Sequence, residues 1–224
     1  MMHQRIGKKF LIYLIIFLML GTINNVNFTI TDIFKIKNIE IFGLENQFNL
    51  NFKSTTSNLY NKNIILLEKH LLKNLIDTNT FVENYDIFKK YPSKLEININ
   101  KTNFLAKKNI NGEFFLVGSN GKLTKNFLLN DELPFIFGNP NVDDVLVLYS
   151  IIKKSKFKFT DLKNLFYYKS GRWDIETKKN ITIKLPTEDV INVLDTIYNF
   201  QLSQNFKVNK IIDARLKNQI ILND

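Results

Sequence analysis

Apolar and polar positions divide the chain into three successive stretches. Residues 10–23 (FLIYLIIFLMLGTI) form a run without a charge, which predicts one apolar helix. Between Phe34 and Asn100, segments with strand-like alternation flank a segment with helical spacing. Beyond Phe104, short apolar segments separated by turn residues predominate. The pattern therefore predicts an N-terminal helix followed by two folded regions, and its fold class is α+β.

The N-terminal run predicts a transmembrane anchor over residues 10–28. Fourteen helical residues measure about 21 Å, which is less than the roughly 30 Å hydrocarbon core of a bilayer, so the span must extend to Phe28. Gly21–Val26 is a poor site for signal-peptide cleavage. A retained anchor is the favoured interpretation, with a cleaved signal or a core helix as alternatives. Basic residues before the run orient the N-terminus toward the cytoplasm: Arg5, Lys8 and Lys9.

The first folded region predicts the order strand, helix, helix, strand, strand. Alternation over Phe34–Phe42 indicates a half-buried strand that Gly43 ends. Apolar residues at helical spacing predict a helix over Ile64–Ile76, and Leu50–Leu59 is ambiguous but compatible with a short helix. Two further strands are expected at residues 81–88 and 95–100, joined by a turn at Tyr91-Pro92-Ser93.

The second folded region predicts a mostly β domain with two helices. Asn111-Gly112 and Asn120-Gly121 indicate hairpin turns with positive φ at both central residues, and a strand at 114–117 lies between them. Leu133–Gly138 is interpreted as an apolar connection. Asn141 or Asp143 is expected to cap a helix that ends near Lys153. A second helix is expected from Pro186 to Phe200. Further strands are predicted at residues 163–168, 173–176, 181–185, 211–215 and 219–222.

Composition argues against catalysis. The absence of cysteine excludes disulfides and thiolate metal sites, and His70 is the sole histidine beyond the predicted anchor. No nucleophile elbow, zinc-protease helix or phosphate-binding glycine loop occurs. The acidic pairs Asp143-Asp144 and Glu188-Asp189 stand at predicted helix starts, where they stabilise the helix N-terminus. We therefore expect no enzyme activity, no cofactor, no metal and no small-molecule substrate.

The charge balance is basic, and arginine is rare within it. Formal net charge is +10, which falls to +7 without the three cations before the anchor. Such a balance suits acidic partners or anionic lipid, although a solvated lysine surface is the favoured explanation. Nucleic-acid binding is not expected, because the aromatic residues lie in apolar strand patterns.

Arg172 and Arg215 are two of only three arginines, and their planar guanidinium groups suit paired hydrogen bonds to carboxylates.

Several motifs in order resemble the FtsQ/DivIB family of bacterial division proteins over nearly the whole chain. In the first region they are Ile36-x-x-Ile39-x-Ile41-x-Gly43, Phe81-Val82 and Tyr91-Pro92. In the second region they are Leu116-Val117 with Gly121, Leu133-Pro134 with Gly138, Gly171-Arg172-Trp173-Asp174-Ile175, Ile183-x-Leu185-Pro186 and Ile212-Asp213-Ala214-Arg215. Lys101–Ala106 departs from the family's Glu-Arg-x-Pro-x-Ala, and only the alanine is shared.

The resemblance implies four parts: a cytoplasmic tail (residues 1–9), an inner-membrane anchor (10–28), a POTRA-like domain (34–103) and a β domain (104–224). It implies a periplasmic, septal, non-enzymatic scaffold that recruits FtsB/FtsL-like division proteins. A partner segment would add a strand to the C-terminal edge of the β domain. The implied contact residues are Arg172, Arg215, Asn218, Gln219, Ile220, Ile221 and Leu222.

Two other functions fit parts of the pattern. A POTRA-containing secretion or outer-membrane assembly component would normally carry repeated POTRA units or a barrel. A soluble periplasmic binding protein would follow from signal cleavage. For the two arginines, pairing with carboxylates of the same chain is the structural alternative to partner contact, with Asp213 the nearest candidate for Arg215.

Overall fold

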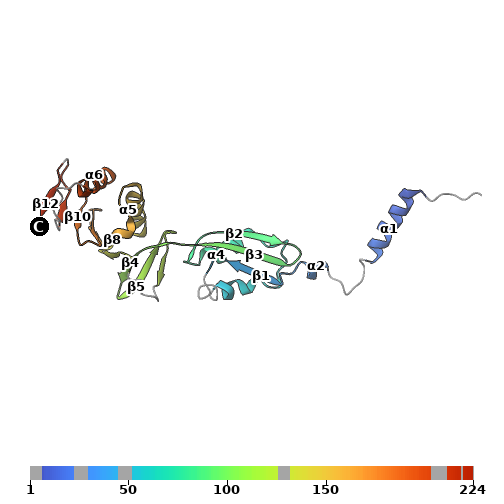
Figure 1. The fold of residues 1–224 in the computed structure, drawn as a ribbon. Coiled ribbons are helices and arrows are strands. Elements are labelled where there is room, and N and C mark those ends of the chain that lie inside the picture. The colour runs from blue at the N-terminus through green and yellow to red at the C-terminus, as the bar shows by residue number, and fades with distance from the viewer. Residues whose placement is uncertain are drawn as a thin grey trace, which may run out of the picture. The chain divides into compact units, whose positions relative to one another are not determined.

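The computed structural model describes residues 7–22, 30–44, 52–125, 132–202, 211–217 and 219–223. Its first helix, α1 (Lys8–Thr22), contains residues 10–22 of the apolar run and has 15 residues (Figure 1). Among the residues described, no helix has both the length and the apolar character needed to cross a membrane. Residues 23–28 of the predicted anchor lie outside the described residues, so the expected span to Phe28 is described only in part.

Contacts between residues divide the chain into two compact units. The first unit comprises residues 1–76 and 85–99, and the second comprises residues 77–84 and 100–224. Residues 77–84 thus group with the later part of the chain. Hydrogen bonds explain this grouping, since Asn120 Nδ2 donates to the carbonyl oxygens of Thr80 (2.9 Å) and Val82 (2.8 Å). The Glu83 carboxylate accepts from the hydroxyls of Thr102 (2.8 Å) and Ser119 (2.7 Å).

The first unit contains a three-stranded sheet with the order β1 (Asn38–Phe42), β3 (Lys94–Lys101), β2 (Val82–Lys90). Strand β1 runs parallel to β3. Between α1 and β2 the described helical segments are α2 (Ile30–Ile33), residues 52–56, the 3-10 helix η1 (Ser57–Leu59) and α4 (Lys69–Asp77). Residues 52–59 are therefore helical, as the ambiguous segment Leu50–Leu59 allowed. Fully buried aliphatic residues from the strands and from the segments between them form the core: Ile36, Leu59, Ile64, Ile76, Leu95 and Ile97. The strands predicted at 81–88 and 95–100 are confirmed.

The helix predicted over Ile64–Ile76 begins five residues late. Residues 64–66 form a turn, because the side-chain oxygen of Asn63 accepts the backbone N–H groups of Ile65 (2.9 Å) and Leu66 (3.4 Å). Ile64 and Leu67 are nevertheless buried. Helical spacing therefore identified core positions correctly, while an asparagine that competes for backbone donors delayed the helix start.

The second unit contains a nine-stranded sheet. Its order is β12 (Ile221–Asn223), β11 (Ile211–Asp213), β10 (Thr182–Lys184), β9 (Trp173–Thr177), β8 (Leu162–Tyr167), β7 (Phe135–Phe137), β4 (Phe104–Ile110), β5 (Glu113–Gly118), β6 (Leu123–Lys125). Helices α5 (Val142–Lys154) and α6 (Val190–Leu202) contribute Val145, Leu148, Ile152, Leu194 and Ile197 to its core. The 3-10 helix η2 (Phe159–Asp161) precedes β8.

Two parts of this sheet differ from the sequence prediction. Leu133–Gly138, expected as a connection, contains β7, which pairs in parallel with both β4 and β8. Strand β4 covers residues for which no strand was predicted. A three-residue strand between two parallel neighbours is too short to show alternation, so its pairing depends on partners distant in sequence.

The helix starts and turns follow local chemistry. Asn141 is the N-cap residue of α5, which confirms one of the two predicted caps, and its backbone N–H donates to the Asp144 carboxylate at 2.9 Å as part of a capping box. Helix α6 begins at Val190 rather than Pro186, because Asp189 has a φ of 56°, which a right-handed helix cannot contain. Asn111-Gly112 has two positive φ values as predicted, whereas at Asn120-Gly121 only the glycine has one.

Gly43 tests the packing of the first unit. Its φ is +91°, and an added Cβ would lie 1.8 Å from the carbonyl oxygen of Ile99. We expect Gly43→Ala to lower the free energy of unfolding by more than about 2 kcal/mol, because β1 and β3 must separate. Gly112→Ala is the matched control, with a φ of +87° and no atom within 4 Å of the added Cβ. Its cost should be about 1 kcal/mol. Equal losses in denaturant-unfolding measurements would contradict the steric explanation.

Candidate partner-binding edge

Strand β12 is the last strand at one edge of the nine-stranded sheet in the described part of the chain (Figure 1). It pairs antiparallel with β11, so that Ile212 lies opposite Leu222 and Asp213 opposite Ile221. An edge strand has one row of backbone N–H and C=O groups without a ladder partner. This edge can therefore accept a further strand through main-chain hydrogen bonds.

The two faces of β12 differ in burial. Leu222 packs against the main hydrophobic cluster, whereas the side chain of Ile221 is 43% exposed on the opposite face. The strand starts at Ile221, two residues later than predicted, because β11 supplies only three pairing residues. Gln219 and Ile220 precede it, and Ile220 also packs against the cluster. Asn218 lies outside the described residues.

A cleft of about 630 Å³ adjoins this edge. Its walls are the start of α6 with the residues before it, and the segment that connects β11 to β12. Apolar lining residues include Pro186, Val193, Leu216 and Ile220, and Arg215 contributes at the same cleft. The cleft can therefore receive a side chain or a turn next to an added strand, with apolar contact and charged groups of both signs, since Lys217, Glu188 and Asp189 also line it.

Arg215 forms a two-pronged pair with Asp213. Its Nε donates to both carboxylate oxygens, at 2.8 and 3.1 Å, and its backbone N–H donates at 3.2 Å. These hydrogen bonds hold the pKa of Asp213 below its ordinary value, and the charge of Lys184 (Nζ at 4.0 Å) adds to the effect. The Arg215 side chain remains 44% exposed. Arg215 thus pairs with a carboxylate of its own chain in the absence of a partner, as the alternative to partner contact predicted.

Arg172 pairs with Asp174 and stacks on Tyr168. Its Nε lies 3.3 Å from an oxygen of Asp174, and its guanidinium carbon lies 4.3 Å from the centroid of the Tyr168 ring. The Asp174 side chain is only 4% exposed. Burial, followed by the Asp174 charge, raises the pKa of Tyr168. The Arg172 side chain donates through Nε to Asp174, contacts Tyr168 and is 22% exposed, so part of its guanidinium group remains accessible to another carboxylate.

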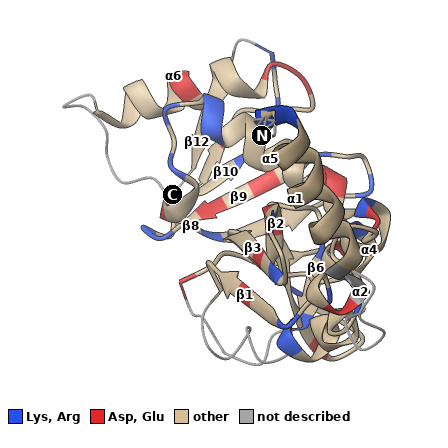
Figure 2. Ribbon diagram, turned by 90° about the vertical axis from the view of Figure 1, so that its right-hand side faces the viewer, with Lys and Arg blue, Asp and Glu red and all other residues tan. Residues whose placement is uncertain are grey.

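Cross-strand register connects the two arginines. Asp174 lies opposite Lys184, Lys184 opposite Asp213, and Asp213 opposite Ile221, so these residues share one face of the sheet. Acidic residues of β9 are red in Figure 2. Arg172 precedes β9, which is three strand spacings of about 4.8 Å from β12. The sheet brings Arg172 near the Arg215 pair but not beside the edge itself.

We call Asp174, Lys184 and Asp213 the charged row. The sequence analysis did not identify Asp174 and Lys184 as members of such a cluster. The face of the sheet on which they lie could have been predicted, because alternation within each strand assigns both residues to the face opposite the core. The order of the strands in the sheet could not have been predicted from this alternation. The lining of the cleft was also missed, since α6 and the segment before β12 are far apart in sequence.

Three comparisons identify similar proteins. Residues 106–215 match the family model described as cell division protein FtsQ/DivIB, C-terminal. This range includes Arg172 and Arg215 and ends before β12. The chain is 23% identical over 202 residues to a cell division protein FtsQ of Rickettsia bellii, which covers 87% of this chain and 74% of that protein. It is 24% identical over 194 residues to the FtsQ of Rickettsia conorii, with coverages of 83% and 71%.

A solved structure is also similar: the major extracytoplasmic domain of the trans isomer of the cell division protein DivIB from Geobacillus stearothermophilus. It covers 47% of this chain and 98% of that domain, at 13% identity and a TM-score of 0.35.

The Asp213 pair predicts a pH-dependent stability. A lowered pKa stabilises the folded state above the ordinary aspartate pKa, and this contribution disappears as the pH falls through the lowered value. At pH 7 we expect Asp213→Asn to reduce the free energy of unfolding by about 1–2 kcal/mol. The difference from the wild-type chain should shrink below about pH 4.

Glu113→Gln is the matched control for this experiment. Glu113 pairs with Lys125, and the two side chains are 54% and 49% exposed. Its removal should change stability by less than about 0.5 kcal/mol. Denaturant titrations at several pH values measure both variants. A pH-independent loss in Asp213→Asn would show that the ion pair does not cause it.

Proposed function

The chain belongs to the FtsQ/DivIB family of cell division proteins, and we propose that it acts as a non-enzymatic scaffold at the division septum. In this proposal it recruits FtsB/FtsL-like division proteins and so regulates septal wall synthesis. The observation that carries the proposal is strand β12, which lies at a sheet edge and has one apolar face packed on the core.

Strand addition is supported by three features of this edge. The outer ladder groups of β12 offer main-chain hydrogen bonds. The cleft beside it, lined in part by Val193 and Leu216, offers apolar contact to residues that flank the added strand. The exposed side chain of Arg215 and the accessible part of the Arg172 guanidinium group offer binding to partner carboxylates. A partner segment with apolar and acidic residues fits these three features together.

The proposed placement is single-pass in the inner membrane, with residues 1–9 in the cytoplasm and the folded units in the periplasm. Helix α1 and the residues that follow it up to Phe28 form the anchor in this proposal. Support comes from the uncharged side chains of α1 after Lys9 and from the basic residues before the apolar run. The first unit, with its three-stranded sheet and preceding helices, is the POTRA-like domain of the proposal.

Removal of β12 tests the edge. We expect a chain that ends at Lys217 to lose co-purification with an FtsB/FtsL-like partner, because both the added ladder and Leu222 are gone. The double variant Ile221→Ala/Asn223→Ala is the control, because it keeps the backbone of β12 and should bind within about tenfold of the wild-type affinity. Circular dichroism must show that the truncated chain is folded. Undiminished capture by a folded truncated chain would contradict strand addition at β12.

Substitution of Arg172 tests its proposed contact with a partner carboxylate. Arg172→Lys keeps the positive charge but loses the planar group over Tyr168 and its paired donors. We expect partner affinity to fall by about tenfold, which is close to 1.4 kcal/mol, with little change in Tm. Lys163→Arg, on the neighbouring strand β8, is a control that should leave affinity unchanged. Wild-type affinity in Arg172→Lys would limit Arg172 to its contacts with Asp174 and Tyr168.

A further inference from the structure

We propose that one end of the first unit docks on the anionic lipid headgroups of the membrane that holds the anchor. This end, called the basal end, consists of residues 33–37, the turn at residues 62–66 and the turn between β2 and β3 at Tyr91–Ser93. The inference rests on the proposed membrane anchor. It concerns a surface distinct from the partner-binding edge, which belongs to the second unit.

The turn presents two exposed apolar side chains in a fixed conformation. Leu66 is 75% exposed and Ile65 is 49% exposed. The Asn63 side chain accepts both of their backbone N–H groups. From the neighbouring strand, Lys89 Nζ donates to the carbonyl oxygens of Ile65 (3.3 Å) and Leu67 (2.9 Å). Because the turn is already ordered, inserting these side chains among headgroups costs little conformational entropy.

Hydrogen bonds place this turn where the chain from the anchor enters the unit. The N–H of Ile64 donates to the carbonyl oxygen of Phe34 (2.8 Å), and the N–H of Ile36 donates to that of Lys62 (2.9 Å). Only residues 23–29 separate α1 from α2. Seven residues reach at most roughly 25 Å. The start of α2 therefore stays close to that distance from the end of α1, and the basal end follows α2 directly in the chain.

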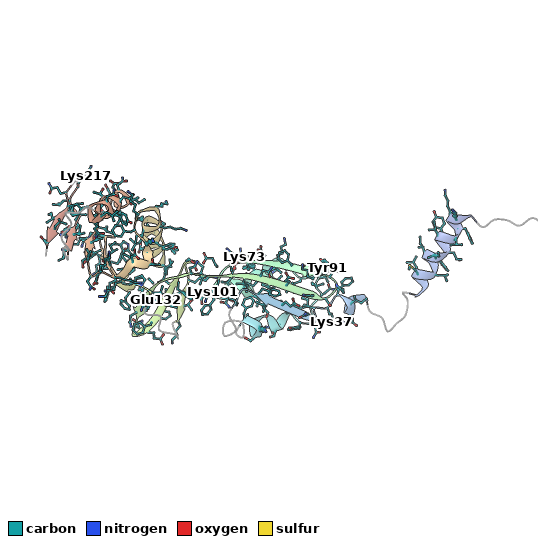
Figure 3. All side chains as sticks on the ribbon, viewed as in Figure 1. Lys37, Lys73, Tyr91, Lys101, Glu132 and Lys217 are labelled. Atoms are coloured by element: carbon teal, nitrogen blue, oxygen red, sulfur yellow. The ribbon has the colours of Figure 1, made fainter. Side chains whose placement is uncertain are left out.

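The second turn adds an aromatic residue at the same end. The N–H of Lys37 donates to the carbonyl oxygen of Ser93 at 2.9 Å, which joins this turn to the start of β1. Tyr91 is 61% exposed, and Figure 3 shows Tyr91 and Lys37 at the end of the unit where α2 lies. Ile33 of α2 is a further exposed aliphatic residue there. Tyrosine is enriched at membrane interfaces, where its ring contacts lipid and its hydroxyl contacts water.

The positive charge of the basal end favours anionic lipid as its binding partner. Asp32 pairs with Lys35 and Glu96 with Lys90, so these carboxylates are neutralised locally. Lys37 and Lys62 are exposed and form no ion pair within the described residues. The basal end thus combines apolar tips with uncompensated positive charge, the combination by which peripheral elements bind anionic membranes.

The absence of cysteine from the sequence allows a single-site test on the full chain. Leu66→Cys, labelled with a fluorophore, is reconstituted in vesicles of phosphatidylglycerol and phosphatidylcholine that contain nitroxide-labelled lipid. The control is Phe42→Cys, because Phe42 is 50% exposed but pairs with Asn98 at the opposite end of the sheet. We expect quenching at position 66 to exceed that at position 42 by at least about twofold. Equal quenching would overturn the proposal.

Charge removal tests the electrostatic part. Lys37→Gln/Lys62→Gln in the Leu66→Cys chain should lower the docked-to-free ratio by about fivefold for each lysine. The control pair Lys153→Gln/Lys154→Gln, on α5 of the second unit, should leave quenching unchanged. Vesicles of pure phosphatidylcholine should reproduce the loss. Quenching that is insensitive to both changes would overturn the choice of anionic lipid.

An alkaline carbonate wash separates this inference from the proposed function. A chain that stays in the membrane pellet but shows no excess quenching at position 66 would overturn docking and leave the anchor intact. A chain that the wash extracts would contradict the anchor. It would also overturn docking, because the reach of the basal end depends on the anchored helix.

Discussion

One row of aliphatic side chains determines the strand register of the sheet in the second unit. Six neighbouring strands each contribute one residue to it, and successive members lie opposite one another in the sheet: Ile136, Leu165, Ile175, Ile183, Ile212 and Leu222. The four central members are fully buried in the cluster that includes α5 and α6. Burial of one such side chain stabilises by about 1.5–3 kcal/mol. Because a one-residue slip would turn a strand's apolar set toward water, this row sets the register of every strand in it.

The same register creates the proposed binding surface. With the aliphatic row inward, Asp174, Lys184 and Asp213 must share the other face, where Arg172 and Arg215 find carboxylates of their own chain. Leu222 fastens β12 to the core while Ile221 faces outward. The proposed partner-binding edge is therefore an extension of the core, and strand addition there would continue an existing ladder.

In the first unit, hydrogen bonds from the backbone to one asparagine side chain determine the proposed membrane-binding surface. The Asn63 side chain accepts the backbone N–H groups of Ile65 and Leu66, so that these residues form a turn before helix α4. Backbone hydrogen bonds place this turn beside residues 34–36. A sequence that reads as one continuous helix becomes a fixed apolar tip with lysines around it. The proposed membrane contact and the proposed partner edge thus belong to different units, and each can be altered without changing the other.

The sequence by itself determined the apolar N-terminal run, the core positions of most strands, the cap of α5 and the family resemblance, because these depend on period, spacing and local hydrogen bonding. The last strand was predicted at residues 219–222 and lies at Ile221–Asn223, since a short apolar segment after a polar turn marks it. Only the tertiary structure decided that β7 lies between β4 and β8, that β12 is an edge strand among the described strands, and that the two arginines pair with carboxylates of one charged row. Strand order depends on hydrogen bonds between segments far apart in the chain, and the alternation within one strand carries no information about which strand will pair with it.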